Sequence, residues 1–233
     1  MNDECAKFFI FFGAPGAGKG SLATMCVKKL GWRQLSTGNL FRKHISEGTE
    51  LGNQIDFAIK SGKLVDDEVV VKTVATWVYE NISLTKAIMC DGFPRTLVQA
   101  RLFIDLLKKD FPKASVCVVK LEISDESVVA RLSSRRMCQE CQATFSVLPG
   151  SDRKPRFEGV CDSCEGALIQ RNDDKPETIL TRLAVYHKHA GELLHFYEQL
   201  GISTVTIDVE KSLDEVFENF VALVGDGSDY CKE

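Results

Sequence analysis

The chain has 233 residues, 44% of them hydrophobic, and carries 29 lysines and arginines against 33 aspartates and glutamates. This length and apolar content suit one large domain or a core with small insertions, and they exclude a disordered chain. A net charge of −4 speaks against a nucleic-acid partner, because that function needs a basic face. The apolar runs are too short to span a bilayer and the N-terminus lacks signal-peptide features, so we expect a cytoplasmic protein without a membrane partner.

The first motif is an apolar run that breaks into a glycine-rich turn. Residues 8–12 read Phe-Phe-Ile-Phe-Phe, and residues 13–21 read Gly-Ala-Pro-Gly-Ala-Gly-Lys-Gly-Ser. The glycines let backbone N–H groups converge, the next helix directs its positive dipole end there, and Lys19 adds a charge. The pattern predicts a strand, a phosphate-binding P-loop and a helix over 22–30. Because Gly20 follows Lys19 and the hydroxyl comes at Ser21, the order favours nucleoside monophosphate kinases over GTPases.

The next segment carries a second potential anion site. A short strand over 32–35 leads to Thr37, which is predicted to cap a helix, and Arg42 is placed to reach an anion at that helix start. Residues 50–60 and 67–81 have helical patterns. The turn between these two helices has backbone groups that can face a ligand.

A buried strand over 87–90 runs into the sequence Asp91-Gly-Phe-Pro-Arg95. A carboxylate at the end of a strand beside a P-loop is the usual place for holding hydrated magnesium, so Asp91 is the candidate. Arg95 follows at the start of the next helix. Gln99 lies four residues further on, and therefore on the same helix face.

The remaining core elements are strands over 115–121 and 202–208, a long helix over 176–199 and a closing helix over 213–224. Strands that alternate with helices predict a parallel sheet with right-handed crossovers, whose ligands bind at the carboxyl ends of the strands. We therefore expect an α/β, P-loop NTPase-like fold with a parallel five-stranded sheet flanked by helices. The P-loop, Asp91 and Arg95 all fall at that edge.

Two C-x-x-C pairs separated by nineteen residues interrupt the second half of the chain. Their members are Cys138, Cys141, Cys161 and Cys164. This spacing is typical of a zinc ribbon, in which four thiolates hold one tetrahedral zinc ion and thereby fold a small flap. The alternative is a metal-free flap, because Gln142 and Glu165 stand where a zinc knuckle often has glycine.

The charge of this flap bears on its function. Residues 132–175 contain seven basic and seven acidic side chains, so the flap is neutral overall. A ribbon that holds a nucleic-acid backbone needs a basic excess, and the balance therefore favours an ordered lid.

Taken in order over nearly the whole chain, these motifs resemble the adenylate kinase family, in its long-lid, zinc-binding type. The resemblance implies a core domain of residues 1–35, 66–133 and 175–233, an inserted NMP-binding flap at 36–65 and a zinc-ribbon-like lid at 134–174. It implies a monomer that converts ATP and AMP reversibly into two ADP, with Mg²⁺ bound to ATP and a structural Zn²⁺. The protein's task in such a reaction is alignment and charge neutralisation, and no general base is required.

The resemblance also assigns individual residues. On the ATP side it implies Gly16, Ala17, Gly18, Lys19, Gly20, Ser21, Arg131, Arg135, Thr144, Phe145 and the backbone carbonyl of Lys211. Around AMP it implies Thr37, Arg42, Lys63, Leu64, Val65, Gly92, Phe93, Pro94, Arg95, Gln99, Arg171 and Arg182. Catalysis is assigned to Lys19, Arg95, Arg135, Arg171 and Arg182. The metal ligands are the four cysteines for zinc and Asp91, through water, for magnesium.

The chain departs from the family pattern at three places, of which the change of the usual Thr to Ser21 is minor because it keeps the hydroxyl. Asn39 stands where the family usually has an aspartate that helps orient magnesium's waters, and residues 148–154 form an inserted loop in the lid. Three alternatives stay open: a GTP:AMP phosphotransferase on the same scaffold, a homologue that binds nucleotide without turnover, and a non-catalytic P-loop protein whose zinc flap binds nucleic acid or a partner.

Overall fold

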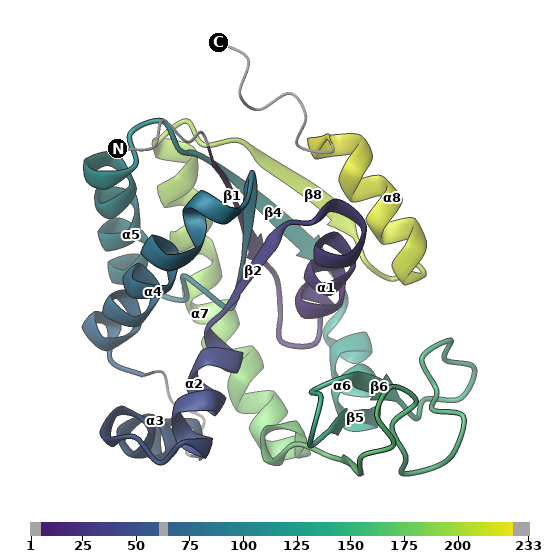
Figure 1. Cartoon of the computed structure of the whole chain (residues 1–233). Helices are drawn as coiled ribbons and strands as arrows, with labels where there is room; N and C mark the ends of the chain where they lie inside the picture. Colours follow the sequence, from purple (N-terminus) through teal and green to yellow (C-terminus); the bar gives the residue numbers. More distant parts are fainter. Residues whose placement is uncertain (1–5, 61–64, 226–233) are drawn as a thin grey trace.

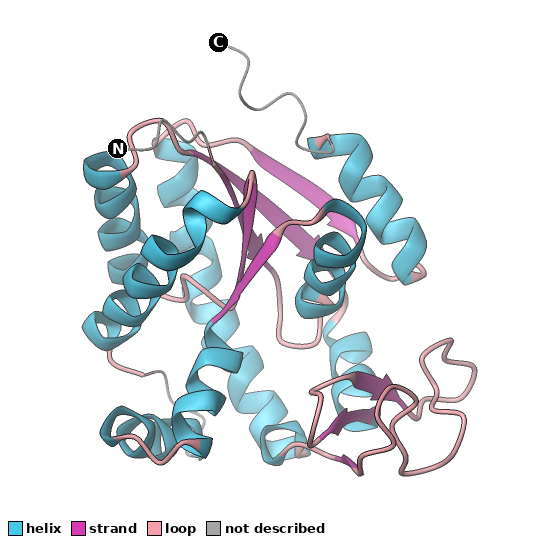
Figure 2. Cartoon of the chain, viewed as in Figure 1, coloured by secondary structure: helices cyan, strands magenta, loops and turns pink. Residues whose placement is uncertain are grey.

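The structure is a computed structural model that describes residues 6–60 and 65–225. Five parallel strands form the central sheet in the order β2-β3-β1-β4-β8, with helices on both faces (Figures 1 and 2). The strands are β1 (Lys7–Phe12), β2 (Arg33–Ser36), β3 (Ala87–Asp91), β4 (Ser115–Glu122) and β8 (Thr204–Asp208). The predicted fold class, a parallel five-stranded α/β sheet, is confirmed.

The helices predicted at 22–30, 50–60, 67–81, 176–199 and 213–224 lie close to observed helices, whereas α6 was not predicted. They are α1 (Lys19–Leu30), α2 (Thr37–Ser46), α3 (Glu50–Lys60), α4 (Asp67–Asn81), α5 (Leu97–Asp110), α6 (Asp125–Ser134), α7 (Pro176–Gln199) and α8 (Leu213–Val224), with short 3₁₀ turns η1 (Ile82–Leu84) and η2 (Asn172–Asp174). None of the helices within residues 6–60 and 65–225 is long and apolar enough to cross a bilayer.

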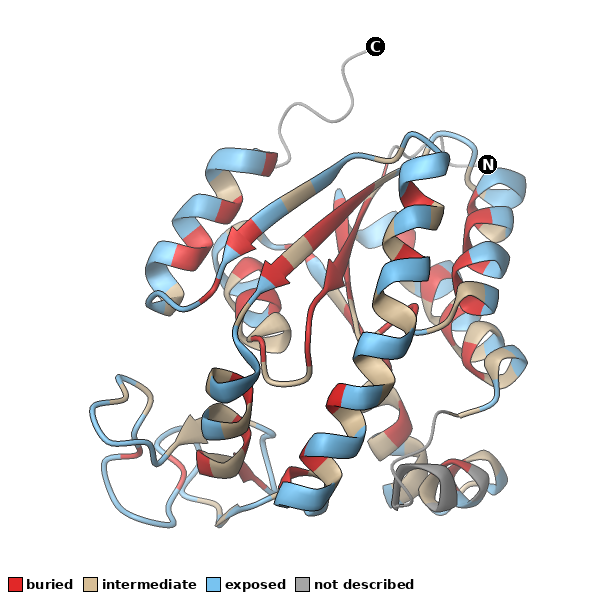
Figure 3. Cartoon of the chain, turned by 180° about the vertical axis from the view of Figure 1, so that it is seen from behind, coloured by how far each residue is buried: buried red, intermediate tan, exposed pale blue. Residues whose placement is uncertain are grey.

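The unbroken apolar run of β1 is explained by burial on both faces of the sheet. Phe8 packs edge-on against Phe103 of α5, at 5.5 Å between ring centroids, in a core that includes residues of α4 and α7. Phe9 points to the opposite face and packs against Phe220 of α8, also at 5.5 Å, in a core shared with α1. Figure 3 shows these buried residues gathered in the strands and on the helix surfaces that face them.

The register of the strands brings the predicted site residues to one edge. Asp91, the last residue of β3, lies opposite Phe11 of β1 and opposite Ser36 of β2. The P-loop leaves β1 directly beyond Phe12, so the loop and the Asp91 carboxylate meet at the carboxyl end of the sheet.

The start of α2 corrects one prediction, because Ser36 and not Thr37 caps this helix. The Ser36 hydroxyl accepts a hydrogen bond from the backbone N–H of Asn39 at 3.4 Å. Strand β2 continues through Ser36, so the extended backbone that a cap requires falls on that residue. Thr37 is the first helical residue, is 2% exposed, and donates its hydroxyl to the carbonyl of Gly92 at 2.9 Å. It therefore ties α2 to the turn after β3.

The segment after α6 forms a small antiparallel sheet of its own. Its strands are β5 (Arg135–Cys138), β6 (Thr144–Ser146) and β7 (Leu168–Ile169), in the order β6-β5-β7. Figure 1 shows this sheet on one side of the carboxyl edge, with α2 and α3 on the other side.

Candidate active site

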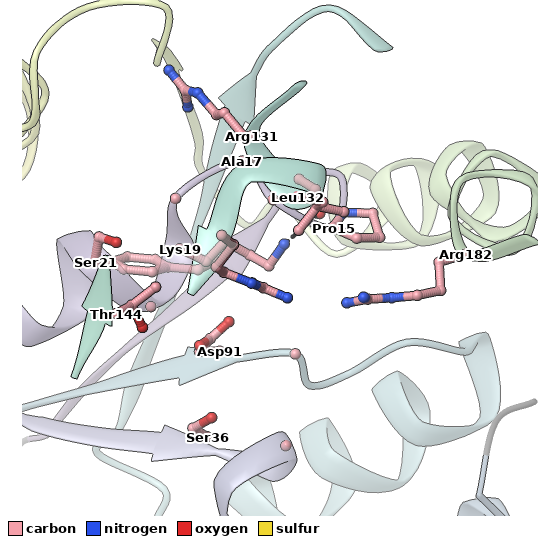
Figure 4. A pocket seen from close by; sticks show the side chains of 18 of the residues that line it. Pro15, Ala17, Lys19, Ser21, Ser36, Asp91, Arg131, Leu132, Thr144 and Arg182 are labelled. Atoms are coloured by element: carbon pink, nitrogen blue, oxygen red, sulfur yellow. Dashed lines mark hydrogen bonds between the residues drawn. The ribbon is translucent and has the colours of Figure 1, made fainter. Parts of the chain in front are cut away.

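A cavity of about 630 Å³ opens at the carboxyl edge of the sheet, between the P-loop, the start of α2 and the small β5–β7 sheet. Most residues predicted for the site line it (Figure 4). They are Gly16, Ala17, Gly18, Lys19, Gly20, Ser21, Thr37, Arg42, Val65, Asp91, Gly92, Pro94, Arg95, Gln99, Arg131, Arg135, Thr144, Phe145, Arg171, Arg182 and Lys211. Lys63 and Leu64 lie outside the described residues.

Phe93 is the predicted site residue that the structure places elsewhere. Its side chain is 1% exposed and packs edge-on against Phe103, with 5.1 Å between ring centroids. The ring belongs to the core under α5, and the cavity is lined by its neighbours Gly92 and Pro94. The buried ring of Phe93 anchors this turn to the core, so the structure does not support a contact between its side chain and a ligand.

The glycines of the P-loop have distinct structural causes. Gly18 precedes α1 in the left-handed region, with a φ of 95°, which L side chains rarely adopt. Gly20 is explained by the close approach of the Asp91 side chain, because a Cβ at position 20 would lie 3.2 Å from Oδ2 of Asp91. A Ser or Thr at position 20 would crowd that carboxylate, which gives a physical reason why the hydroxyl comes one residue later at Ser21.

Lys19 is folded back on the loop that precedes it. Its ammonium donates to the backbone carbonyls of Gly13 at 2.7 Å and of Ala14 at 2.8 Å. The pKa of Lys19 is lowered to about 8, mainly by burial and also by the cations of Arg95 and Arg182, while the nearby Asp91 opposes this shift. The P-loop thus holds an ammonium group whose charge is not fully balanced by its neighbours, and an anionic ligand would stabilise this charge.

Asp91 and Arg182 approach the same space from opposite sides of the cavity. Figure 4 shows the Arg182 side chain directed into the cavity from the side of α7 and the Asp91 carboxylate opposite it, while Arg131 points away. Arg131 instead donates to the carbonyl of Val209 at 2.6 Å. The amide of Gln34 donates to Oδ2 of Asp91 at 3.4 Å and orients that carboxylate.

The α2 side of the cavity presents a half-buried, incompletely bonded guanidinium. Nη2 of Arg42 hydrogen-bonds to Oδ1 of Asn39, whereas its Nε is buried without a hydrogen-bond partner among the described residues. Burial lowers the pKa of Arg42. A buried donor without a partner carries a free-energy cost, and an anionic ligand beside α2 would remove it.

Arg95 and Gln99 belong to one hydrogen-bonded turn. The Arg95 guanidinium is exposed to the cavity, and its Nε donates to the carbonyl of Gly92 at 2.8 Å. Gln99 is 2% exposed, accepts from the Arg95 backbone N–H at 2.8 Å and donates to Asp67 at 2.8 Å. Gln99 therefore fixes the turn that presents Arg95 to the cavity. This structural role is separate from any contact that Gln99 makes with a ligand.

Three further arginines reach the cavity from around the small sheet and α7. Arg135 is held by fully buried Asp174 through two hydrogen bonds, of 2.7 and 2.5 Å. Arg182 pairs with Asp173 at 3.0 Å and with Asp174 at 3.4 Å. Burial lowers the pKa of Arg171, and the neighbouring cations Arg135 and Arg42 lower it further. The two carboxylates orient this cluster without cancelling its charge, which suits a polyanionic ligand.

The four cysteines of the two C-x-x-C pairs converge beside β5. Their sulfur atoms all lie within 4.8 Å of one another, with 3.4 Å between Cys138 and Cys164 and 3.5 Å between Cys141 and Cys161. Tetrahedral zinc with Zn–S bonds of about 2.3 Å needs sulfurs roughly 3.8 Å apart, so the cluster fits this ion. Gln142 and Glu165 both have a φ of 61°, so they adopt the conformation for which knuckles usually use glycine.

Sequence reasoning missed Arg153 and Gln34, which both line the cavity. Gln34 could have been found from its position, since it precedes the carboxyl end of β2 by two residues and lies beside Asp91. Arg153 had no comparable signal, because it lies in an irregular loop whose path depends on tertiary contacts.

A P-loop, a strand-end carboxylate and converging arginines at the edge of a parallel sheet define a P-loop phosphotransferase. A family model described as adenylate kinase matches residues 11–202. The chain is 37% identical to an adenylate kinase of Agathobacter rectalis over 93% of this chain and 99% of that protein, and 38% identical to one of Clostridioides difficile over 94% and 98%. The chain belongs to the adenylate kinase family. It is therefore a nucleoside monophosphate kinase, a phosphotransferase.

Proposed function

We propose that this chain transfers a phosphoryl group reversibly between ATP and AMP to form two ADP. The observation that carries the proposal is the cavity in which Lys19 of the P-loop faces arginines from α2, the turn after β3 and the β5–β7 segment. In phosphoryl transfer the charge spreads over the equatorial oxygens of the moving group, so positioned cations are the main requirement. The curated relatives named above carry the same activity in their names.

The chain's own residues supply alignment and charge. We assign Lys19 and the N–H groups of the loop up to Ser21 to the donor phosphates, and Thr37 and Arg42 to the acceptor. The remaining arginines surround the transferring group and are Arg95, Arg135, Arg171 and Arg182. Asp173 and Asp174 hold two of these guanidinium groups in place, so little reorganisation is needed when charge develops.

Two metal ions fit the side chains present. Asp91 would hold hydrated magnesium, which when bound neutralises charge on the phosphates. The four sulfur atoms beside β5 would hold zinc, which folds a segment with little core of its own. We propose residues 36–65 as the acceptor flap and residues 134–174 as the lid, with the rest of the chain as the core.

The identity of the donor nucleotide's base, adenine or guanine, is the most detailed part of the proposal and needs a direct test. ATP, GTP or CTP is paired with AMP, GMP, CMP or UMP in the presence of magnesium, and the products are analysed. We expect rapid formation of two ADP from ATP and AMP and slower turnover with the other pairs. A preference for GTP with AMP identifies the alternative, a GTP:AMP phosphotransferase, and the absence of transfer in every pair refutes the proposal.

We expect ATP binding to weaken above pH 8. The pKa of Lys19 is about 8 in the free protein, and donor phosphates beside the ammonium raise it. Below this pH Lys19 is already charged and ATP binds with its full affinity. Above it, binding must be accompanied by the uptake of a proton, so the affinity for ATP falls by up to about tenfold per pH unit. Calorimetric titration at pH 7 to 9.5, in buffers of different ionisation enthalpy, measures this uptake. AMP binding, as the control, should show no uptake centred near pH 8, and ATP binding without proton uptake contradicts the assignment of Lys19.

A further inference from the structure

The inserted loop of the lid brings an additional arginine into the cavity. After β6 the chain folds back, and Ser146 donates its backbone N–H to the carbonyl of Arg153 at 3.0 Å. Nη1 of Arg153 then hydrogen-bonds to the hydroxyl of Ser21, which lies in the first turn of α1, and Nη2 donates to the carbonyl of Thr144 at 2.7 Å. Arg153 thereby joins the lid to the P-loop.

Among the described residues, the guanidinium of Arg153 forms no ion pair. Both hydrogen-bond acceptors are neutral, and no carboxylate within residues 6–60 and 65–225 lies at ion-pair distance. Arg135 differs, because Asp174 accepts two hydrogen bonds from it. Burial lowers the pKa of Arg153, and the nearby Asp152 offsets this only in part. A half-buried cation without a partner is costly, and an anionic ligand in the cavity supplies the missing charge.

We propose that Arg153 binds the phosphate chain of the donor nucleotide. The inference rests on the proposed function, which assigns the side of the cavity at Ser21 to the donor. A phosphate oxygen would replace the neutral Ser21 hydroxyl as the acceptor of one guanidinium arm, and a hydrogen bond between two charged groups is the stronger one. The N-terminus of α1 favours the same anion. Arg42 and Thr37 lie on α2, so the acceptor nucleotide should not depend on Arg153.

The test measures binding without turnover in the full chain. ATP, inorganic tripolyphosphate and AMP are titrated separately into the unaltered protein and into Arg153→Gln. We expect the dissociation constants of ATP and tripolyphosphate to rise about 10- to 100-fold and that of AMP to stay unchanged. Arg153→Lys, which keeps a charge without the planar fork, should lose less. Arg156→Gln is the matched control, because Arg156 is exposed in the same segment and does not line the cavity.

Three results would overturn the proposal. Unchanged affinity for ATP and tripolyphosphate means that Arg153 only ties the loop to Ser21. A loss for ATP but not for tripolyphosphate indicates contact with the base or ribose. An equal loss for AMP, together with a lower melting temperature or zinc content, indicates damage to the fold. Failure of the proposed function is separate, since a chain that binds ATP but forms no ADP from ATP and AMP refutes that reaction and leaves these titrations interpretable.

Discussion

Replacing Arg95 by alanine is expected to slow ADP formation from ATP and AMP by two to four orders of magnitude, the range of other electrostatic groups in dry sites. The Arg95 guanidinium projects into the cavity, and its side chain makes one hydrogen bond, to the Gly92 carbonyl, with no carboxylate at ion-pair distance among the described residues. Its removal should therefore leave the folded state nearly as stable. The measurement is kcat with both substrates saturating.

The controls for this prediction separate chemistry from structure. Arg101→Ala removes an exposed arginine from α5, the helix that follows the turn carrying Arg95, and should leave kcat unchanged because Arg101 does not line the cavity. Arg95→Lys should recover part of the rate, because lysine keeps the charge and loses the planar fork. A loss of less than about tenfold for Arg95→Ala would show that Arg95 does not stabilise the transition state.

Replacing Cys161 by serine should release the zinc ion and lower kcat/KM for ATP by at least about 100-fold. Cys161 is 1% exposed, and its sulfur lies 3.5 Å from that of Cys141, so one substitution removes a buried ligand from the cluster. Structural zinc supplies a large part of the folding free energy of small ribbons. Without it the segment that carries Arg135 and Arg171 loses its order, and each lost phosphate contact costs roughly 100-fold.

Metal analysis and ADP formation, measured on the same preparation, check this second prediction. Cys117→Ala is the matched control, because Cys117 is buried in β4 and belongs to the core around α1 and α8. The control protein should keep one zinc ion per chain. A Cys161→Ser protein with one zinc ion and full activity contradicts the prediction, as does unaltered protein that contains no metal when purified without added metal.

Local patterns were enough to predict most of the core, because most elements carry their own signals, although α6 was not predicted. The ranges 50–60, 67–81, 176–199 and 213–224 match α3, α4, α7 and α8. Gly31 ends α1 in the left-handed region, as a glycine after a helix commonly does. The continuous apolar run at 8–12 predicted a strand before the P-loop, and the structure shows that strand buried on both faces.

Tertiary contacts decided what the sequence could not show. Ser36 replaces Thr37 as the cap because β2 is held one residue longer by pairing with β3, which opposes Ser36 and Asp91. Phe93 lies in a motif that suggests ligand contact, yet its ring fills space under α5. The contact between Arg153 and Ser21 joins residues 132 positions apart. No local pattern predicts such a contact.

The two turns of the cysteine cluster that lack glycine show that the local rule, which expects glycine after each C-x-x-C pair, was too strict. Gln142 and Glu165 adopt positive φ, a conformation that costs a non-glycine residue of order 1 kcal/mol. The turns are nevertheless closed, because Cys138 donates its N–H to the carbonyl of Ala143 at 2.9 Å and Cys161 to that of Gly166 at 2.9 Å. The missing glycines therefore do not argue against a zinc site.

The central claim, direct transfer between two nucleotides in one cavity, is tested most directly by following the label of γ-³²P-ATP. The protein is mixed with labelled ATP, unlabelled AMP and magnesium, and the products are separated during the first turnovers. Our account predicts label in the β-phosphate of newly formed ADP, with almost none in inorganic phosphate, because closure of the proposed lid over both nucleotides would exclude water. Label that appears mainly in inorganic phosphate, or that stays in ATP, would contradict it.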